Sequence, residues 1–517
     1  MTTKNYLKIG KATDLNGMEY IGYRALEILP GFLSLGTFAF LIYLSYTKPI
    51  TAAFIIIVFD VYWLLLVAYL GILLISAYRE LKRNTKINWE QKCKTLKIGS
   101  NELRFNWQKV VQLIILPTYN ESEKIISDSI EAIKNDSFPN KKIIIVLAIE
   151  ERAGRIFLKN AHRIREKYKN VFRSFLITVH PDGIEGEIKG KGANQAWAAR
   201  IAKEQIIDKY NIDYGKILVS VFDIDTVIKN GYFFCLTHRF LTTKNPYNAS
   251  YQPIPVYRNN IWQAPFFARI AANSNTFWQM MQQIRQEKLA TYSSHSMTFK
   301  TLVVLDFWST NMVSEDSRIF WHALLHYNGN YRVEPLYFPV SMDVCMGEDK
   351  FTTLKNLYKQ QRRWGWGAEN VPYLIFNTIK RRANIKKSVL IRHILVQVYG
   401  FHSWATNAII IALIGWMPIM IGGDSFNKLV LSKNLPFITE GLMRFAMIGL
   451  VLSAVISTLL LPKHPKKLTL ISRAWMLVQW LLLPISIIAL GSIPALEAQV
   501  RLMLGKYMGF WATPKER

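Results

Sequence analysis

The stretch Lys216-Ile-Leu-Val-Ser-Val-Phe-Asp-Ile-Asp225 decides the fold of this chain. Its apolar run from Ile217 to Phe222 ends directly in carboxylates. Short, continuous apolar runs of this kind are typical of strands buried on both faces of a parallel sheet. Because residues two apart in an extended segment point the same way, we expect Asp223 and Asp225 to face one ligand.

Three other apolar runs end in polar residues in the same way. Val110 to Leu116 runs into Pro117-Thr-Tyr-Asn-Glu121, Lys142 to Ile149 into Glu150-Glu151, and Phe175 to His180 into Pro181-Asp-Gly183. Longer amphipathic stretches separate the runs, which is the pattern of strands joined by crossover helices. We therefore predict an α/β fold with a mostly parallel sheet, whose carboxyl edge gathers all four polar endings around one crevice.

The hydrophobic residues, 50% of the 517, are too many for one ordinary soluble domain. They concentrate in five runs: Ile28 to Tyr46, Ile50 to Ala77, Ala405 to Ile421, Phe445 to Leu461 and Ala474 to Leu490. Each run reaches or approaches the roughly 20 residues that cross a bilayer core. We expect five or six crossings, because Pro484 and Pro494 could break the last run into a re-entrant hairpin or add a crossing.

The predicted domains follow from these runs. A cytosolic N-terminal tail (residues 1–27) precedes a two-helix transmembrane hairpin (28–78), and a C-terminal transmembrane region (389–495) precedes a cytosolic or interfacial tail (496–517). The region between, residues 79–388, has normal polarity and is long enough for a domain with its own core. We expect the catalytic domain there, ending in interfacial helices.

The net charge of +28 indicates which side of the membrane this domain occupies. Basic residues crowd the two membrane approaches, Tyr78 to Lys94 and Lys359 to Arg392. Lys and Arg at membrane ends are typical of cytosolic anchors on anionic headgroups, and no nucleic-acid-binding motif accompanies the charge. We expect an integral protein of a bacterial-type plasma membrane with a cytosolic catalytic domain, and no nucleic-acid partner.

The widely separated Cys93, Cys235 and Cys345 fit no metal or redox spacing, which agrees with a cytosolic face.

Two motifs could hold the charged part of a substrate. Asp223 and Asp225, together with substrate phosphates, would suit Mg²⁺ or Mn²⁺; the alternative is an acidic turn after a buried strand. Glu187-Ile-Lys-Gly-Lys-Gly-Ala-Asn194 precedes a predicted helix from Gln195 to Lys203. Loop amides at a helix start, together with Lys191, would suit a diphosphate; the alternative is a plain flexible turn.

Two further motifs could supply a general base and an anion-binding surface. Ser314-Glu-Asp316 precedes a predicted helix from about Ser317 to Leu325, and a carboxylate there could take a proton from a hydroxyl. Capping of the helix N-terminus alone would favour the same residues. In Gln360-Gln-Arg-Arg-Trp364, Gln360, Arg363 and Trp364 share one helical face that combines an anion clamp with a stacking surface. The alternative is a basic interfacial helix.

Together, in this order, the motifs resemble the family 2 glycosyltransferases. Gln360-x-x-Arg363-Trp364 resembles the membrane-integrated branch that includes cellulose, chitin and hyaluronan synthases. The resemblance covers roughly Val110 to Trp366 and implies a GT-A-like cytosolic domain that binds a nucleotide-sugar, with transmembrane helices on both sides.

The resemblance also implies roles for individual residues. Tyr119, Asn120 and Glu121 would hold the base and ribose, Asp223 and Asp225 the ribose, diphosphate and Mg²⁺ or Mn²⁺, and Gln360, Arg363 and Trp364 the diphosphate and acceptor end, with Lys191 and Asn194 assisting. Asp316, beside Glu315, would be the general base. The family commonly has aspartates at the end of the second strand, whereas this chain has Glu150, to which we transfer their role.

The predicted function is metal-assisted, inverting transfer of a sugar, from what we expect to be a UDP-sugar, to a growing polysaccharide at the membrane. Single-sugar transfer to a lipid or lipid-phosphate carrier uses the same catalytic parts and remains an alternative. A remote alternative is a transporter with an inactive transferase domain. The sequence leaves open the donor sugar, the linkage and whether partner subunits export the product.

Overall fold

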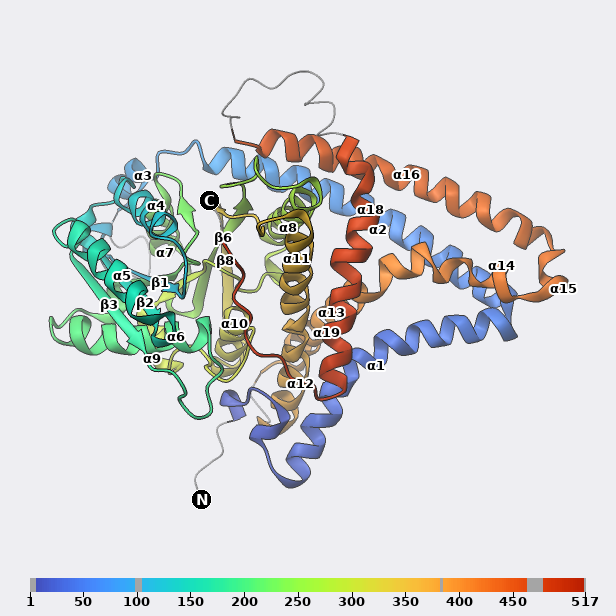
Figure 1. Cartoon of the computed structure of the whole chain (residues 1–517), viewed down its shortest axis with the longest axis horizontal. Helices are drawn as coiled ribbons and strands as arrows, with labels where there is room; N and C mark the ends of the chain where they lie inside the picture. Colours follow the sequence, from blue (N-terminus) through green and yellow to red (C-terminus); the bar gives the residue numbers. More distant parts are fainter. Residues whose placement is uncertain (1–5, 98–104, 382–384, 463–477, 516–517) are drawn as a thin grey trace.

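The computed structural model describes residues 6–97, 105–381, 385–462 and 478–515. A body built around a β-sheet lies at one side of the molecule, and long helices extend from it to the other side (Figure 1). The described residues form one sheet of eight strands in the order β3-β2-β1-β4-β7-β6-β8-β5. The sheet has a parallel half and a mixed half.

The parallel half is the one that the sequence predicts. It consists of β1 (Val111–Thr118), β2 (Ile143–Glu150), β3 (Ser174–His180) and β4 (Ile217–Val221). β1 pairs in parallel with both β2 and β4, and β2 pairs in parallel with β3. The predicted α/β fold with a mostly parallel sheet is confirmed, and the four polar strand endings lie along its carboxyl edge.

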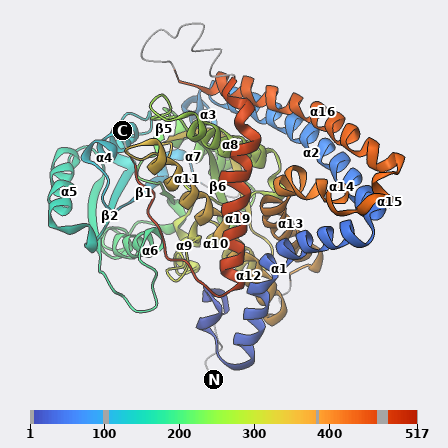
Figure 2. The same cartoon turned by 45° about the vertical axis from the view of Figure 1, so that its right-hand side comes forward.

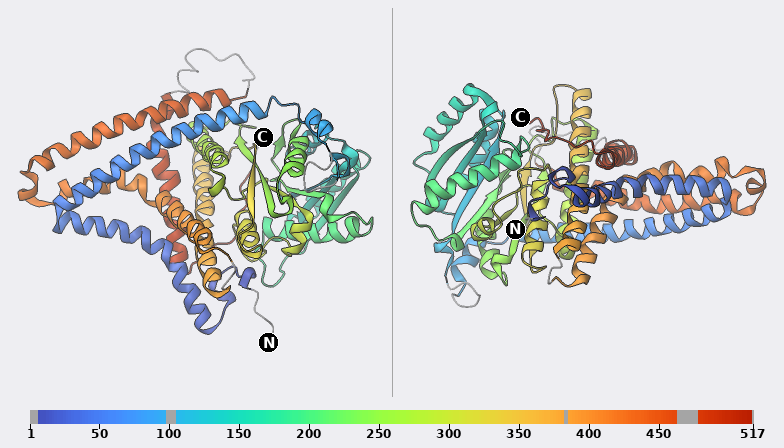
Figure 3. Two further views of the ribbon diagram at one scale, coloured as in Figure 1. Left: turned by 180° about the vertical axis from the view of Figure 1, so that it is seen from behind. Right: turned by 90° about the horizontal axis from the view of Figure 1, so that it is seen from below.

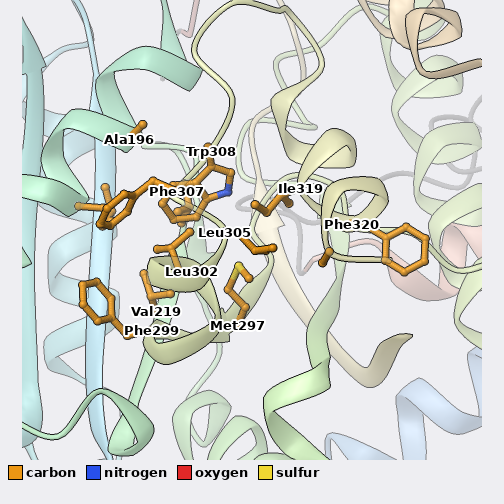
Figure 4. Packing of buried hydrophobic residues seen from close by; sticks show 14 of the residues in the cluster. Ala196, Val219, Met297, Phe299, Leu302, Leu305, Phe307, Trp308, Ile319 and Phe320 are labelled. Carbon is orange, nitrogen blue, oxygen red and sulfur yellow. The ribbon is translucent and has the colours of Figure 1, made fainter. Parts of the chain in front are cut away.

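Strand β1 shows why these runs are apolar throughout. Leu113 and Ile115 belong to one hydrophobic cluster and Ile114 and Leu116 to another, on the opposite face. Because successive side chains of a strand point to opposite faces, a strand covered on both sides needs an apolar residue at every position. Figure 4 shows the first cluster, where Ala196 of α6 and Val219 of β4 meet Trp308 and Leu302.

The mixed half was not predicted strand by strand. It contains β7 (Ser296–Thr298), β6 (Ala249–Tyr257), β8 (Arg332–Met342) and β5 (Val227–Ile228). β7 runs antiparallel to β4 and to β6, while β6 and β8 are parallel and shift register at Pro253. Proline has no N–H for a ladder hydrogen bond, which explains an irregularity there. These strands are short or interrupted by proline, so they lack a clear sequence pattern.

Helices cover both faces of the sheet (Figures 1 and 2). The helices of this body are α3 (Trp89–Thr95), α4 (Glu123–Lys134), α5 (Gly154–Tyr168), α6 (Lys191–Ala202), α7 (Tyr232–Thr242), α8 (Phe266–Ile284), α9 (Phe299–Val304), α10 (Glu315–His326), α11 (Lys350–Gly365) and α12 (Asn370–Arg381). The helix expected from Gln195 begins four residues earlier, at Lys191, because the chain turns at Gly190 with φ of 142°. The helix expected from Ser317 is α10, and it includes the acidic pair in its first turn.

Five described helical segments are long and apolar enough to cross a membrane. They are α1 (Gly17–Thr47), α2 (Pro49–Asn84), α13 (Lys387–Ala412), α16 (Val430–Leu460) and the segment Gln479–Met503, which ends in α19 (Ile493–Met503). α2 lies alongside α16, and α19 passes next to the sheet-containing body (Figures 2 and 3).

The predicted runs differ in extent from these helices: α1 begins at Gly17, before the predicted start at Ile28 and inside the predicted tail, and α2 continues past Ala77 to Asn84. The run expected from Ala405 to Ile421 is split, because α13 ends at Ala412 and a separate short helix, α14, covers Met417–Ile421. Pro418, which cannot donate a helical hydrogen bond to an earlier turn, sits at the start of α14. The run expected from Phe445 starts earlier, at Val430. The first residues of the run expected from Ala474 lie outside the described residues.

Candidate active site

Lys191 lies at the centre of the predicted residues. Its ammonium nitrogen is 2.6 Å from Asp223 Oδ1, 2.9 Å from Asp316 Oδ2 and 4.0 Å from Glu315 Oε1. Lys191 is at the first position of α6, Asp223 follows β4, and the acidic pair opens α10. Three elements far apart in the sequence therefore bring one cation and three carboxylates together.

The close approach of α6 and α10 depends on a glycine. A Cβ at Gly192 would lie 3.1 Å from both Glu315 Cγ and the Ser309 carbonyl oxygen. A larger side chain at this position would push the two helix starts apart. The Gly-Lys-Gly loop thus has a packing reason for its second glycine, in addition to the loop flexibility that the sequence indicates.

Charge and burial act against each other in this cluster. Burial by itself would lower the pKa of Lys191, but the carboxylates of Asp223 and Asp316 outweigh it and raise the pKa. Burial would raise the pKa of Asp223, but Lys191 and Lys515 hold it below its usual range. Burial, with a smaller contribution from Asp316, raises the pKa of Glu315 to about 8. Glu315 is only 2% exposed, whereas the Asp316 side chain is 23% exposed and can meet a substrate.

The segment before β7 bonds to the Asp223 carboxylate and to the backbone of Asp316. The Ser293 hydroxyl donates to Asp223 Oδ2 at 2.6 Å, and the Thr291 hydroxyl donates to the Asp316 carbonyl at 2.6 Å. His295 is fully buried behind Asp316, with Nδ1 3.9 Å from Asp316 Oδ1. Its Nδ1 is 2.8 Å from the Tyr292 carbonyl, and its Nε2 accepts a hydrogen bond from Trp308, so the ring is a neutral imidazole with its proton on Nδ1. Burial lowers the pKa of His295, which favours this neutral form.

Asp225 is held by loops of the mixed half. Its Oδ2 accepts from the Asp343 backbone N–H at 2.8 Å, and its carbonyl accepts from Asn259 Nδ2 at 2.9 Å. Asn259 also donates to Asp343 Oδ1 at 2.8 Å. The other carboxylate oxygen of Asp225 forms an ion pair with Lys515, from the C-terminal tail.

The ending of β1 shows two different roles among its predicted residues. Glu121 accepts from the Tyr119 backbone N–H at 2.8 Å and from the Thr118 hydroxyl at 2.7 Å, so it closes the turn. Tyr119 lies under the guanidinium of Arg152, 4.3 Å from its ring centre, and Asn120 is exposed. The turn thus presents Tyr119 and Asn120 while Glu121 stabilises it.

Glu150 lies at a small cavity beside this turn. Arg152 donates to Glu150 Oε2 at 2.7 Å. The cavity, about 90 Å³, is lined by Glu150, Arg152, His180, Asp182, Glu187 and Lys189, among others. It lies at the carboxyl ends of β2 and β3, the edge where open α/β sheets bind their ligands.

Asn194 is buried in the first turn of α6. It is 1% exposed and donates from Nδ2 to the Ala148 carbonyl of β2 at 2.8 Å. This hydrogen bond ties α6 to the sheet.

The predicted motif Gln360-x-x-Arg363-Trp364 lies in the last two turns of α11. Gln360 is buried, and the ring of Trp364 lies 6.3 Å from that of Tyr257. The guanidinium of Arg363 lies over the ring of Phe510, 4.9 Å from its centre. The motif therefore faces Tyr257, whose phenol pKa is raised first by burial and then by Asp223 and Asp225.

A buried glutamate connects this helix to the acidic pair. Just after α11, Glu369 accepts from the Ser314 backbone N–H at 2.9 Å and from the Ser314 hydroxyl at 2.6 Å. Its other oxygen accepts from Trp366 Nε1 at 2.9 Å. The position of Glu315 and Asp316 is thus coupled to the end of α11.

The structure supplies only part of the predicted binding site for a divalent cation. Among the described residues, no group of three or more His, Cys, Asp and Glu side chains converges as a metal site. Asp225 pairs with the Lys515 ammonium, and Asp223, two residues earlier, pairs with the Lys191 ammonium, so both carboxylates lie next to cations. Two carboxylates with substrate phosphates are a usual set of ligands for Mg²⁺, so the pair suits a metal that arrives with a diphosphate.

Sequence reasoning missed the residues that orient the site: Ser293, His295, Asn259, Asp343, Glu369 and Lys515. The polar run Thr291 to Ser296 next to an apolar stretch was a signal for the first two. The others stand alone in the sequence, and only the contacts of the folded chain reveal them.

No protein-family profile and no curated protein sequence matches the chain. Solved structures with a similar fold include glycosyltransferases. One is the mannosyltransferase PcManGT from Pyrobaculum calidifontis in complex with GDP-Man and Mn²⁺, with a TM-score of 0.41, 13% identity and coverage of 87% of this chain and 100% of that one. Another is residues 1–349 of S. aureus TarS in complex with UDP-GlcNAc, with a TM-score of 0.35, 13% identity and coverage of 68% and 91%. Likeness this remote transfers no substrate, metal or mechanism to this chain.

Proposed function

We propose that this protein is a membrane-bound glycosyltransferase that moves a sugar from a nucleotide-sugar to a hydroxyl group. The observation that carries the proposal is the Lys191 ammonium shared by Asp223 and Asp316 at the carboxyl edge of the parallel half-sheet. This edge is where open α/β sheets bind their ligands. An accessible carboxylate next to an anion-binding lysine is the pair of groups that sugar transfer from a diphosphate needs.

In the proposed reaction, Asp316 accepts the proton of the acceptor hydroxyl. The hydroxyl oxygen forms a bond to the anomeric carbon, while the bond from that carbon to the diphosphate oxygen breaks. The electron pair of the broken bond leaves on the nucleoside diphosphate. Attack from the face opposite the leaving group inverts the anomeric centre.

Two cationic side chains of this protein lie where we propose that the diphosphate leaving group binds. Lys191 lies between Asp223 and Asp316, and Arg363 lies across the site on α11. Fixed positive charges at the place where negative charge develops stabilise the transition state. Asp223 and Asp225 would hold Mg²⁺ or Mn²⁺, which when bound supplies further charge to the diphosphate.

The acceptor end of the site is attached to an apolar helix. Arg362 and Tyr358 of α11 both bind Glu497 of α19, each at 2.7 Å. A Cβ at Gly365 would lie 2.9 Å from the Cα of Ala495, so the end of α11 packs directly on α19. This attachment supports an acceptor that is membrane-bound or that leaves through the membrane, which fits a growing polysaccharide and also a lipid carrier.

The test is release of nucleoside diphosphate by the purified, detergent-solubilised protein over a panel of UDP- and GDP-sugars, with Mg²⁺, Mn²⁺ or EDTA. We expect turnover with one donor and loss of turnover in Asp316→Asn. Asp208→Asn, a change of the same kind at an exposed position after α6, should retain activity.

The size of the product separates the candidate functions. A ladder of sugars identifies polysaccharide synthesis, and a single added sugar in a lipid extract identifies transfer to a carrier. If neither the unmodified protein nor Asp208→Asn binds any nucleotide-sugar of the panel, the proposal is contradicted.

A further inference from the structure

Arg318 is a buried charged residue that the proposed reaction does not use. It lies on α10, two residues after Asp316, and it is 1% exposed. Residues two apart on a helix do not face each other, so Arg318 points into the protein while Asp316 faces Lys191. The first turn of α10 therefore carries the proposed general base on one side and a guanidinium on the other.

The guanidinium of Arg318 joins α10 to two other parts of the chain. Nε donates to Asn370 Oδ1 at 2.7 Å and Nη2 donates to the Glu369 carbonyl at 3.3 Å, where α12 begins. Nη1 donates to the Ile9 carbonyl, far away in the sequence, at 2.7 Å. The guanidinium also lies over the ring of Tyr373, 3.8 Å from its centre. Because the donors of a guanidinium have fixed directions, these contacts hold the helix in one position.

The residues that Arg318 binds also bind the start of α10. Asn370 Nδ2 donates to the Ser317 hydroxyl at 3.0 Å, and the Glu369 carboxylate accepts from the backbone and the hydroxyl of Ser314. Burial raises the pKa of Glu369, and the charge of Arg318 is the largest effect that opposes this rise. An ionised carboxylate accepts more hydrogen bonds than a protonated one, so Arg318 strengthens the hold of Glu369 on Ser314.

The carbonyl that Nη1 binds belongs to a segment before the first apolar helix. Residues 7–14 lie next to α10, α12 and the start of α1 (Figures 1 and 2). A Cβ at Gly10 would lie 2.5 Å from the carbonyl oxygen of Asn311, in the loop before the acidic pair, so the two backbones are in contact. The Ala12 backbone N–H donates to Glu27 of α1 at 2.9 Å. The segment therefore connects an apolar helix to the loop and helix that carry the acidic pair.

We propose that Arg318 is a positioning residue that holds Asp316 in place for proton transfer, and that residues 7–14 support it from the N-terminal side. The proposal rests on the proposed function. A general base has to lie within hydrogen-bond reach of the hydroxyl whose proton it accepts. Arg318 fixes the side of the helical turn that faces away from the substrate, and this fixes the direction in which Asp316 projects. The N-terminal segment, through the Ile9 carbonyl, supplies one of the acceptors that fix Arg318 itself.

The first experiment combines two substitutions. Arg318→Met removes the donors, and because a misplacement of about 1 Å can cost about 10²-fold in rate, we expect turnover to fall by about that factor. Calorimetry should show unchanged affinity for the nucleoside diphosphate of the active donor. In Asp316→Asn the base is already absent, so adding Arg318→Met should cost less than about threefold, since residues that act as a unit are not additive. Arg155→Met, at an exposed position of α5, is the matched control and should keep wild-type turnover.

The second experiment removes the N-terminal support without changing α10. Deletion of residues 1–9 removes the Ile9 carbonyl, and deletion of residues 1–5 is its control, because it leaves all of these contacts in place. We expect lower turnover with unchanged nucleoside diphosphate affinity in the first deletion, and wild-type turnover in the second. Arg318→Lys keeps the charge, but one ammonium cannot replace a planar set of donors, so turnover should stay low. If Arg318→Met fails to fold, as unfolding midpoints in detergent would show, Arg318→Lys and the deletions decide.

The outcomes separate this proposal from the proposed function. Equal losses from Arg318→Met with and without Asp316→Asn would overturn it, because Arg318 would then act independently of the base. Wild-type turnover in Arg318→Met, or weaker binding of nucleoside diphosphate, would also overturn it. Each of these results leaves the proposed function standing. Absence of turnover in the unmodified protein would overturn the proposed function and this proposal with it.

Discussion

The two halves of the sheet differ in how they serve the site. The parallel half consists of buried, regular strands whose ends supply groups for chemistry, Asp223 after β4 among them. The mixed half combines two long, proline-containing strands with two very short ones, and its loops supply hydrogen bonds to those groups, such as that from Ser293 to Asp223. A regular strand can place a carboxylate only at its end. Loops tolerate irregular backbone, so they can surround that carboxylate with hydrogen-bond donors. One half therefore presents the charges, and the other orients them.

The largest effect should come from the groups that act directly. Asp316→Asn removes the proposed base while keeping the size of the side chain, so we expect turnover to fall by about 10³-fold, within the range for general bases. Steady-state release of nucleoside diphosphate measures it, with Asp208→Asn as the control. If Asp316→Asn turns over at the wild-type rate, another residue is the general base.

The next largest effect should be a loss of stability where the two halves of the sheet meet. Lys191→Met leaves Asp223 and Asp316 without their shared cation, and breaking a buried pair of this kind costs about 3 kcal/mol. The midpoint of thermal unfolding in detergent should fall clearly. Lys189→Met is the matched control, because Lys189 is in the same loop with a side chain that is 56% exposed. Equal midpoints for both variants would show that the cluster stabilises nothing.

Glu315 should make stability depend on pH. Its pKa is about 8 in the folded protein, raised by burial from an ordinary 4.5. The folded state then binds more protons than the unfolded state between these values, so stability should decrease as pH rises from about 4.5 to about 8, by about 1.4 kcal/mol per pH unit at most. Unfolding midpoints across this range should show the decrease, and Glu315→Gln should flatten it. The same slope in both proteins would contradict the assignment.

The smallest effect should come from the mixed half alone. Asn259→Ala removes hydrogen bonds to the Asp225 carbonyl and to Asp343, which we expect to cost about 1 kcal/mol and to weaken Mn²⁺ binding. Asn160→Ala, at a partly exposed position of α5, is the control for stability. If Asn259→Ala leaves Mn²⁺ affinity unchanged, the mixed half does not orient the carboxylate as we infer.

The predictions that succeeded depend on local patterns. The apolar runs that become β1 to β4 could be recognised because a strand covered on both faces has to be apolar at every position. The acidic pair at the start of α10 and the shared face of Gln360, Arg363 and Trp364 follow from helix geometry. The hydrogen bond from Asn194 to the sheet could not be predicted, since its motif does not show which way a buried amide points.

The predictions that fell short depend on distant contacts. Nothing near Lys515 in the sequence indicates that it meets Asp225, 290 residues away. The split of the run from Ala405 could be suspected from Pro418, but the packing of α13 against α1 and α12 could not.

By itself, the sequence determined the order of strands and helices in the parallel half, the apolar segments, and which residues could carry charge at the strand ends. These are consequences of periodicity and of side-chain chemistry, which act over a few residues. Only the tertiary structure decided that Lys191 joins Asp223 to Asp316, that loops of the mixed half hold Asp225, and that the tail lies in the site. Such contacts form when the burial of apolar surface on both faces of the sheet brings distant segments together, and their partners are specified by the shape of the whole fold.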